Sequence, residues 1–109
     1  MTDRSSASAP QEFAHFRDFY PFYLSEHHNA VSRRLHVAGT GLVLLTVAAA
    51  LISGQLKWLL VLPVVGYGPA WIGHFFYEKN RPATFSHPFY SLMGDFRMFA
   101  DVISGRIKW

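Results

Sequence analysis

The amino-acid sequence predicts an all-α integral membrane protein built on a helical hairpin, with spans at about residues 35–56 and 58–77. Neither stretch contains a formally charged residue, and Lys57 is the single charge between them. The hydrocarbon core of a bilayer, about 30 Å thick, is crossed by about 20 helical residues at about 1.5 Å each, so both stretches have a suitable length. Neither has the polar face that an amphipathic helix of a soluble protein shows.

The turn of the hairpin is also marked in the sequence. Residues 53–57 form a short and mainly polar segment, and Gly54 is typical of the residue that ends a helix. In the second span, Pro63 and Pro69 with glycines between them predict a kink or a local opening. The alternative is a buried hairpin inside a soluble helical bundle, but a chain of 109 residues leaves little protein to cover it.

The composition excludes several classes of protein. Only 16% of the residues are charged, against about a quarter in an ordinary soluble domain, which excludes a highly charged coiled coil. The absence of cysteine excludes a disulfide scaffold, a thiolate metal site and cysteine catalysis. The net charge of +3 arises from basic residues that lie between apolar segments, so we expect no nucleic-acid partner.

The basic residues predict the orientation of the hairpin. Arg33, Arg34, Lys79 and Arg81 flank its two outer ends, whereas Lys57 alone marks the turn. By the positive-inside rule, both termini therefore face the cytoplasm. Residues 1–12 are polar and predict a disordered lead without a signal peptide, which leaves 13–109 as a single membrane-embedded helical domain.

Apolar side chains recur at helical spacing on both sides of the hairpin, which predicts flanking amphipathic helices at the cytoplasmic face. They are Phe13, Phe16, Tyr20, Tyr23 and Leu24 before the hairpin, and Phe89, Leu92, Met93, Phe96, Phe99 and Ile103 after it. A partial span is the alternative for the second segment.

The placement of the histidines predicts a metal centre. His36 lies at the entrance of the first span and His74 near the exit of the second, and an antiparallel hairpin brings these positions to the same membrane face. His27 and His87 lie outside the spans at similar distances, so they reach the same face. Imidazole is the commonest metal ligand in proteins, so these four histidines are the predicted ligands. Of His27 and His28, only one can point inward on a regular helix.

The predicted metal is Fe(II), with Zn as the runner-up, because a site without cysteine is rich in nitrogen donors. Glu78 follows His74 by four residues and shares its helix face, so it is the predicted catalytic carboxylate. Asp95 and Glu26 are weaker candidates. The alternatives are histidines that only pack or form hydrogen bonds, and a Glu78 that only forms a salt bridge.

Three polar residues at the rim of this face are predicted to bind the carboxylate or headgroup of a lipid substrate. They are Arg33, Asn80 and Arg81. Simple anchoring of the arginines at the membrane surface is the alternative.

A set of motifs that covers nearly the whole of residues 13–109 resembles one protein family. The motifs are Tyr23-Leu24-Ser25-Glu26-His27, Arg34-Leu35-His36, Gly73-His74 with Glu78, Asn80-Arg81-Pro82-Ala83-Thr84, and Asp95-Phe96-Arg97-Met98. They resemble the small membrane-protein family that includes the fungal 2-hydroxy-palmitic acid dioxygenase. The block from Gly73 to Ala83 is the most specific part of the resemblance.

The resemblance implies an Fe(II)-dependent dioxygenase of fatty-acid α-oxidation, which uses O2 to shorten a 2-hydroxy fatty acid by one carbon. It also implies that His27, His36 and His74 are the histidines needed for activity. The acyl tail is expected between the spans, along Leu42, Leu45, Val61, Val65 and Tyr67.

Two other functions and one assembly remain open at this point. The chain could be a non-catalytic membrane scaffold or lipid-binding protein, or a Zn-dependent membrane hydrolase with Glu78 as its base. Because two spans enclose little volume, a homodimer that completes a cavity is a further option.

Overall fold

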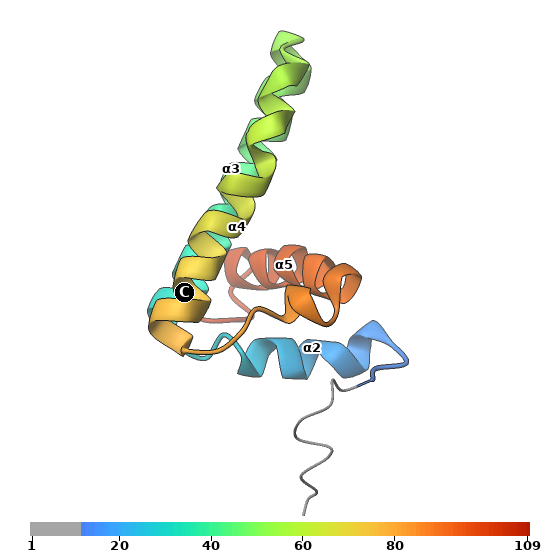
Figure 1. The fold of residues 1–109 in the computed structure, drawn as a ribbon, viewed down its shortest axis with the longest axis vertical. Coiled ribbons are helices and arrows are strands. Elements are labelled where there is room, and N and C mark those ends of the chain that lie inside the picture. Colours follow the sequence, from blue (N-terminus) through green and yellow to red (C-terminus); the bar gives the residue numbers. More distant parts are fainter. Residues whose placement is uncertain (1–11) are drawn as a thin grey trace, which may run out of the picture.

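The computed structural model describes residues 12–109, in which every regular element is a helix (Figure 1). The elements are α2 (Phe16–Ser25), α3 (Ala30–Ser53), η1 (Leu56–Val61), α4 (Leu62–Ile72), η2 (Gly73–Glu78), η3 (Ala83–Phe85) and α5 (Pro88–Ile103). The predicted all-α class is confirmed. The predicted polar lead of residues 1–12 lies outside the described residues, apart from Glu12.

The first arm of the hairpin is the 24-residue helix α3. The side chain of Asn29 caps its start by accepting hydrogen bonds from the backbone N–H groups of Val31 and Ser32, at 2.9 and 3.2 Å. The helix ends at Gly54, whose φ of 74° is the left-handed conformation that glycine adopts without strain. Because of this cap, α3 begins at Ala30, five residues before the predicted start at 35. Its first two turns therefore include both Arg33 and Arg34.

The second arm is helical throughout, but the type of helix changes along it. The 3-10 helix η1 is followed by the α-helix α4 and then by the π-helix η2. Both arms are long and apolar enough to cross a membrane, since the most apolar 18-residue windows within 30–53 and 56–78 have mean hydropathies of 2.1 and 1.4. Only 28% and 17% of the most apolar window of each arm is buried, whereas a core helix of a soluble protein is mostly buried. The two predicted spans are therefore present as candidate membrane spans.

The two prolines of the second arm lie at different places in α4 (Leu62–Ile72). Pro63 lies in the first turn of α4, where its missing N–H costs no hydrogen bond. Pro69 lies inside α4 and has no N–H to donate to the carbonyl of Val65. The two arms approach closely at this level, because a Cβ added to Gly39 would lie only 3.4 Å from that carbonyl oxygen.

The flanking helices α2 and α5 lie in two layers across the base of the hairpin (Figure 1). Phe19 and Tyr23 of α2 pack with Met98 of α5 in the buried core. The buried face of α5 consists of Ser91, Gly94, Met98 and Asp101. The large apolar residues of α5 mostly lie on its exposed side, where Phe89, Leu92, Met93 and Ile103 are at least 48% exposed.

Candidate metal centre

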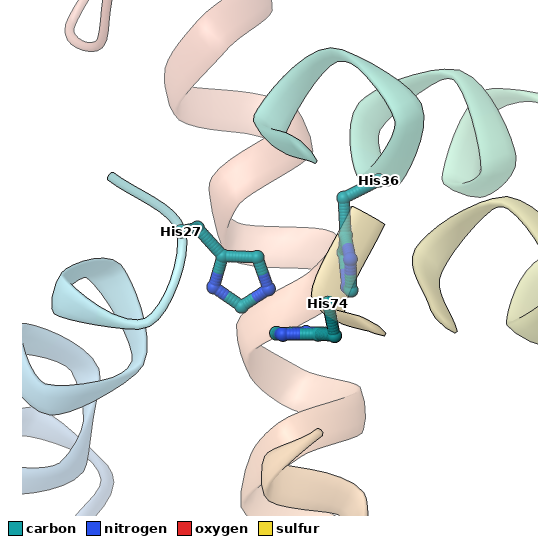
Figure 2. A group of neighbouring side chains, drawn as sticks. All are labelled: His27, His36 and His74. Atoms are coloured by element: carbon teal, nitrogen blue, oxygen red, sulfur yellow. The ribbon is translucent and has the colours of Figure 1, made fainter. Parts of the chain in front are cut away.

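Three histidines from three segments converge at the base of the hairpin. His27 follows α2, His36 lies in the second turn of α3, and His74 lies in η2; Figure 2 shows their rings directed toward one another. One ring nitrogen from each lies within 4.8 Å of the other two, and all three residues are buried. The ring centroids of His36 and His74 are 5.5 Å apart, and that of His27 is 4.4 and 4.5 Å from them.

A close contact between the two arms sets the level of His36 and His74. A Cβ added to Gly73 would lie 2.9 Å from Oγ and 3.1 Å from Cα of Ser32, so only glycine allows this approach. Ser32 precedes His36 by one helical turn, and Gly73 directly precedes His74. The arms are therefore in contact just beside the two histidines, which fixes both imidazoles at one height.

The wider π-helical turn of η2 carries His74. Such turns are rare and frequently occur at functional sites. The turn ends at Lys79, the only residue other than glycine with a positive φ (59°) in the described part of the chain. This reversal directs Asn80 back toward His74, so that Oδ1 of Asn80 lies 2.7 Å from Nδ1 of the imidazole.

Each of the three imidazoles has one nitrogen against an oxygen acceptor. Nδ1 of His27 is 2.7 Å from the carbonyl of Tyr23, and Nε2 of His36 is 2.5 Å from Oδ1 of Asp95. Asn80 supplies the third acceptor, and its own amide N–H group donates to the carbonyl of Glu26, which fixes its orientation. An acceptor places the ring proton on the nitrogen that faces it and leaves a lone pair on the other nitrogen.

The nitrogens with lone pairs are then Nε2 of His27, Nδ1 of His36 and Nε2 of His74. The first two are buried and have no hydrogen-bond partner among residues 12–109. A buried polar atom without a partner is costly, and a bound metal ion removes that cost. The donor set therefore fits a divalent metal bound by three neutral imidazoles, with other coordination positions open.

The surroundings favour the protonation states that such a site requires. Burial, and after it the neighbouring His36 and His74, lowers the pKa of His27 well below its ordinary value, so this ring is neutral at pH 7. Burial and the carboxylate of Asp95 raise the pKa of Tyr23, so its phenol keeps the proton that it donates.

The sequence pattern placed Tyr23 only among the apolar residues of the first flanking helix, and it indicated Asp95 only as a weaker candidate than Glu78. The phenol of Tyr23 donates to Oδ1 of Asp95 at 2.5 Å, the same oxygen that accepts from His36. The ring of Tyr23 lies against Gly94, where an added Cβ would be 2.8 Å from its Cδ2 atom. The usable signals were the Gly94-Asp95 pair and the i, i+4 spacing of Tyr23 and His27.

The predicted ligand His87 lies apart from the three convergent histidines. Its ring packs against the aromatic rings of Phe13 and Phe19, with centroids 5.2 and 5.4 Å away. Its Nδ1 atom is 2.8 Å from Oγ of Ser86. Of the adjacent pair, His27 points inward with 1% exposure, and the side chain of His28 is 75% exposed.

The side chain of Glu78 is fully buried beside the start of α3. Its Oε2 atom accepts the backbone N–H of Asn29 at 2.8 Å. Its Oε1 atom lies 3.0 Å from Nδ1 of His28 but accepts no aligned hydrogen bond from the described residues. Glu78 thus ties the end of the second arm to the start of the first.

The predicted substrate-binding residues have different surroundings. Arg33 donates to the backbone carbonyls of Lys108 and His27, at 3.0 and 3.1 Å. Arg81 is exposed, and its guanidinium lies 4.9 Å from the ring centroid of Phe85. Asn80 directly supports His74.

Comparison with known protein families gives a match over most of the chain. The sequence profile of a family described as 2-hydroxy-palmitic acid dioxygenase Mpo1-like matches residues 13–107. No curated protein and no solved structure matches the chain. The matched range contains the three convergent histidines and all of the helices described above. The chain belongs to the 2-hydroxy-palmitic acid dioxygenase Mpo1-like family.

Proposed function

We propose that the chain is a membrane-embedded, Fe(II)-dependent dioxygenase that shortens a 2-hydroxy fatty acid by one carbon. One observation carries the proposal: three buried imidazoles each have a ring nitrogen within 4.8 Å of the other two, and each ring also has one nitrogen against an oxygen acceptor. The family description supports the substrate class.

The overall reaction balances with O2 as the only oxidant. A 2-hydroxy acid, R–CH(OH)–COOH, and O2 give R–COOH, CO2 and H2O. The two carbons of the cleaved bond lose four electrons in total, and O2 gains four. Bound Fe(II) would supply O2 activation and chelation of the 2-hydroxy acid.

The residues of the chain have three proposed roles in this reaction. His27, His36 and His74 hold the metal, and Asn80 and Asp95 orient two of these ligands. Arg81 and Arg33 bind the carboxylate of the substrate at the rim. Glu78 acts as the acid or base that exchanges a proton with the substrate. This role is supported by its Oε1 atom, which is buried without an aligned hydrogen-bond partner.

The proposed location is a membrane, with both termini and the metal centre on the cytoplasmic side. The basic residues at the base of the hairpin support this orientation, and the exposed apolar side chains of both arms support the location. A homodimer stays a prediction, and the mass of the detergent-solubilised protein tests it.

The deciding experiment is metal analysis of protein purified in mild detergent, followed by an oxygen-electrode trace with 2-hydroxypalmitate. We expect about one iron per chain and O2 uptake that stops in His36→Ala and His74→Ala. Protein without metal would support a scaffold or lipid-binding role. Zinc with hydrolytic activity would support the hydrolase.

A further inference from the structure

A cavity of about 270 Å³ lies between α3, α4 and α5, directly beside the metal centre. At one end, His36 and Asp95 form part of its wall. Its other walls are mainly apolar and include Val43 of α3, Leu62 of α4, and Leu92 and Phe96 of α5. The cavity therefore has one polar end and an apolar body.

The polar end can accept a hydroxyl group. Oδ1 of Asp95 already accepts from Tyr23 and His36. Oδ2 of the same carboxylate accepts no hydrogen bond from residues 12–109, and the side chain of Asp95 keeps 19% of its surface exposed. A ligand hydroxyl that donates to Oδ2 would satisfy it beside the three imidazoles.

The apolar body extends along the hairpin, away from the metal centre. Val43 follows His36 by seven residues on α3, about 10 Å along the helix axis. The outer wall is open, because Leu92 and Phe96 are 51% and 39% exposed on the side of α5 that faces away from the core. A ligand can thus enter sideways, from the apolar surroundings of the two arms.

We propose that this cavity binds the first part of a single acyl chain, which enters from the bilayer between α4 and α5 and places its hydroxy-acid end at Asp95 and His36. This inference rests on the proposed function and adds the position and entry route of the substrate. Of the expected tail residues, Tyr67 lines the cavity, whereas Leu42, Leu45 and Val61 line a separate hollow.

The test blocks the far end of the cavity while leaving the polar end intact. Leu62→Trp fills that end, and Leu60→Trp is the matched control because Leu60 is two residues away, 82% exposed and outside the cavity. Each protein is loaded with Zn²⁺, which has no redox chemistry, so that the acid is bound and not consumed. Equilibrium binding of radiolabelled 2-hydroxypalmitate and 2-hydroxyhexanoate is then measured in lipid nanodiscs.

We expect Leu62→Trp to weaken binding of 2-hydroxypalmitate at least tenfold and to leave 2-hydroxyhexanoate and the zinc content unchanged. Leu60→Trp should bind both acids as the wild-type protein does. If the two variants bound the acids equally well, or if Leu62→Trp weakened the binding of both acids equally, the inference would be overturned. The proposed reaction would not be affected by that result. The expected pattern without O2 uptake by the iron-loaded protein would overturn the reaction alone. Wild-type protein that binds neither acid would overturn both.

Discussion

Nε2 of His36 lies 2.5 Å from Oδ1 of Asp95, which joins the first arm of the hairpin to α5 at the metal centre. The two residues are 59 positions apart in the sequence. The contact places the ring proton of His36 on Nε2 and leaves a lone pair on its buried Nδ1 atom. Since Tyr23 donates to the same oxygen, α2, α3 and α5 all meet at this one carboxylate.

Asp95→Ala should therefore lower the metal affinity about 10- to 100-fold, the usual cost of losing a partner of a ligating histidine. Asp95→Asn keeps an oxygen acceptor, so its metal affinity should fall less than that of Asp95→Ala. Affinity is measured by competition with a coloured chelator. The control is Asp101→Ala on the same helix, since Asp101 accepts from Tyr20 and Arg97 and contacts no histidine. Equal loss of affinity in both variants would contradict a specific role for Asp95.

The glycine contact between the two arms gives a second prediction. Gly73→Ala places a methyl group 2.9–3.2 Å from Oγ, Cα and the carbonyl oxygen of Ser32, and two of these atoms belong to backbone that cannot rotate away. We expect a loss of about 1–3 kcal/mol in the free energy of unfolding, together with weaker metal binding, because His74 must shift.

Gly68→Ala is the matched control in the same arm. A Cβ at this position meets nothing within 4 Å, and alanine favours a helix by up to about 1 kcal/mol. Thermal unfolding of both variants in one detergent gives the comparison. If Gly73→Ala were as stable and as rich in metal as Gly68→Ala, the arms would not be in contact at this level.

The sequence was sufficient to predict the hairpin and the height of His36 and His74. Gaps in charge determine the spans, and antiparallel geometry then determines which residues share a membrane face. The sequence could not show the π-helical turn at His74, because such turns are rare single-turn variants within an α-helix. It also could not pair Asp95 with His36, since that contact requires α5 to lie across the base of the hairpin.

Glu78→Gln tests the proposed catalytic role of the buried carboxylate. Glutamine keeps an oxygen that can accept the N–H of Asn29, so the fold and the metal content should be retained. Loss of the charge should lower the turnover of 2-hydroxypalmitate about 10²- to 10⁴-fold, the usual contribution of a positioned acid or base. Full turnover in this variant would limit Glu78 to holding the start of α3.

Glu26 gives a prediction for the pH dependence of stability. Burial, and after it the nearby carboxylate of Glu78, raises the pKa of Glu26 above its ordinary value. The folded state therefore binds this proton more tightly than the unfolded state, and the stability that the group contributes is present at acidic pH and lost as pH rises through the raised pKa.

Glu26→Gln removes this dependence, so it should raise the midpoint of thermal unfolding at pH 7.5 and have a smaller effect at pH 5. Glu12→Gln is the control, because Glu12 is exposed. If Glu26→Gln raised the unfolding midpoint more at pH 5 than at pH 7.5, the pKa of Glu26 would not be raised in the folded state.

The orientation in the membrane can be tested cleanly because the chain contains no cysteine. Gln55 lies in the turn of the hairpin and Ser104 directly follows α5, and both are exposed. The basic residues at the base of the hairpin favour the cytoplasmic side for that end.

α3 is about 36 Å long at about 1.5 Å per residue, enough to carry the turn across a core of about 30 Å. A membrane-impermeant maleimide should therefore label Gln55→Cys in intact cells and Ser104→Cys only after permeabilisation. The reverse pattern would place the metal centre on the opposite side, and labelling of both in intact cells would exclude a hairpin that crosses the membrane.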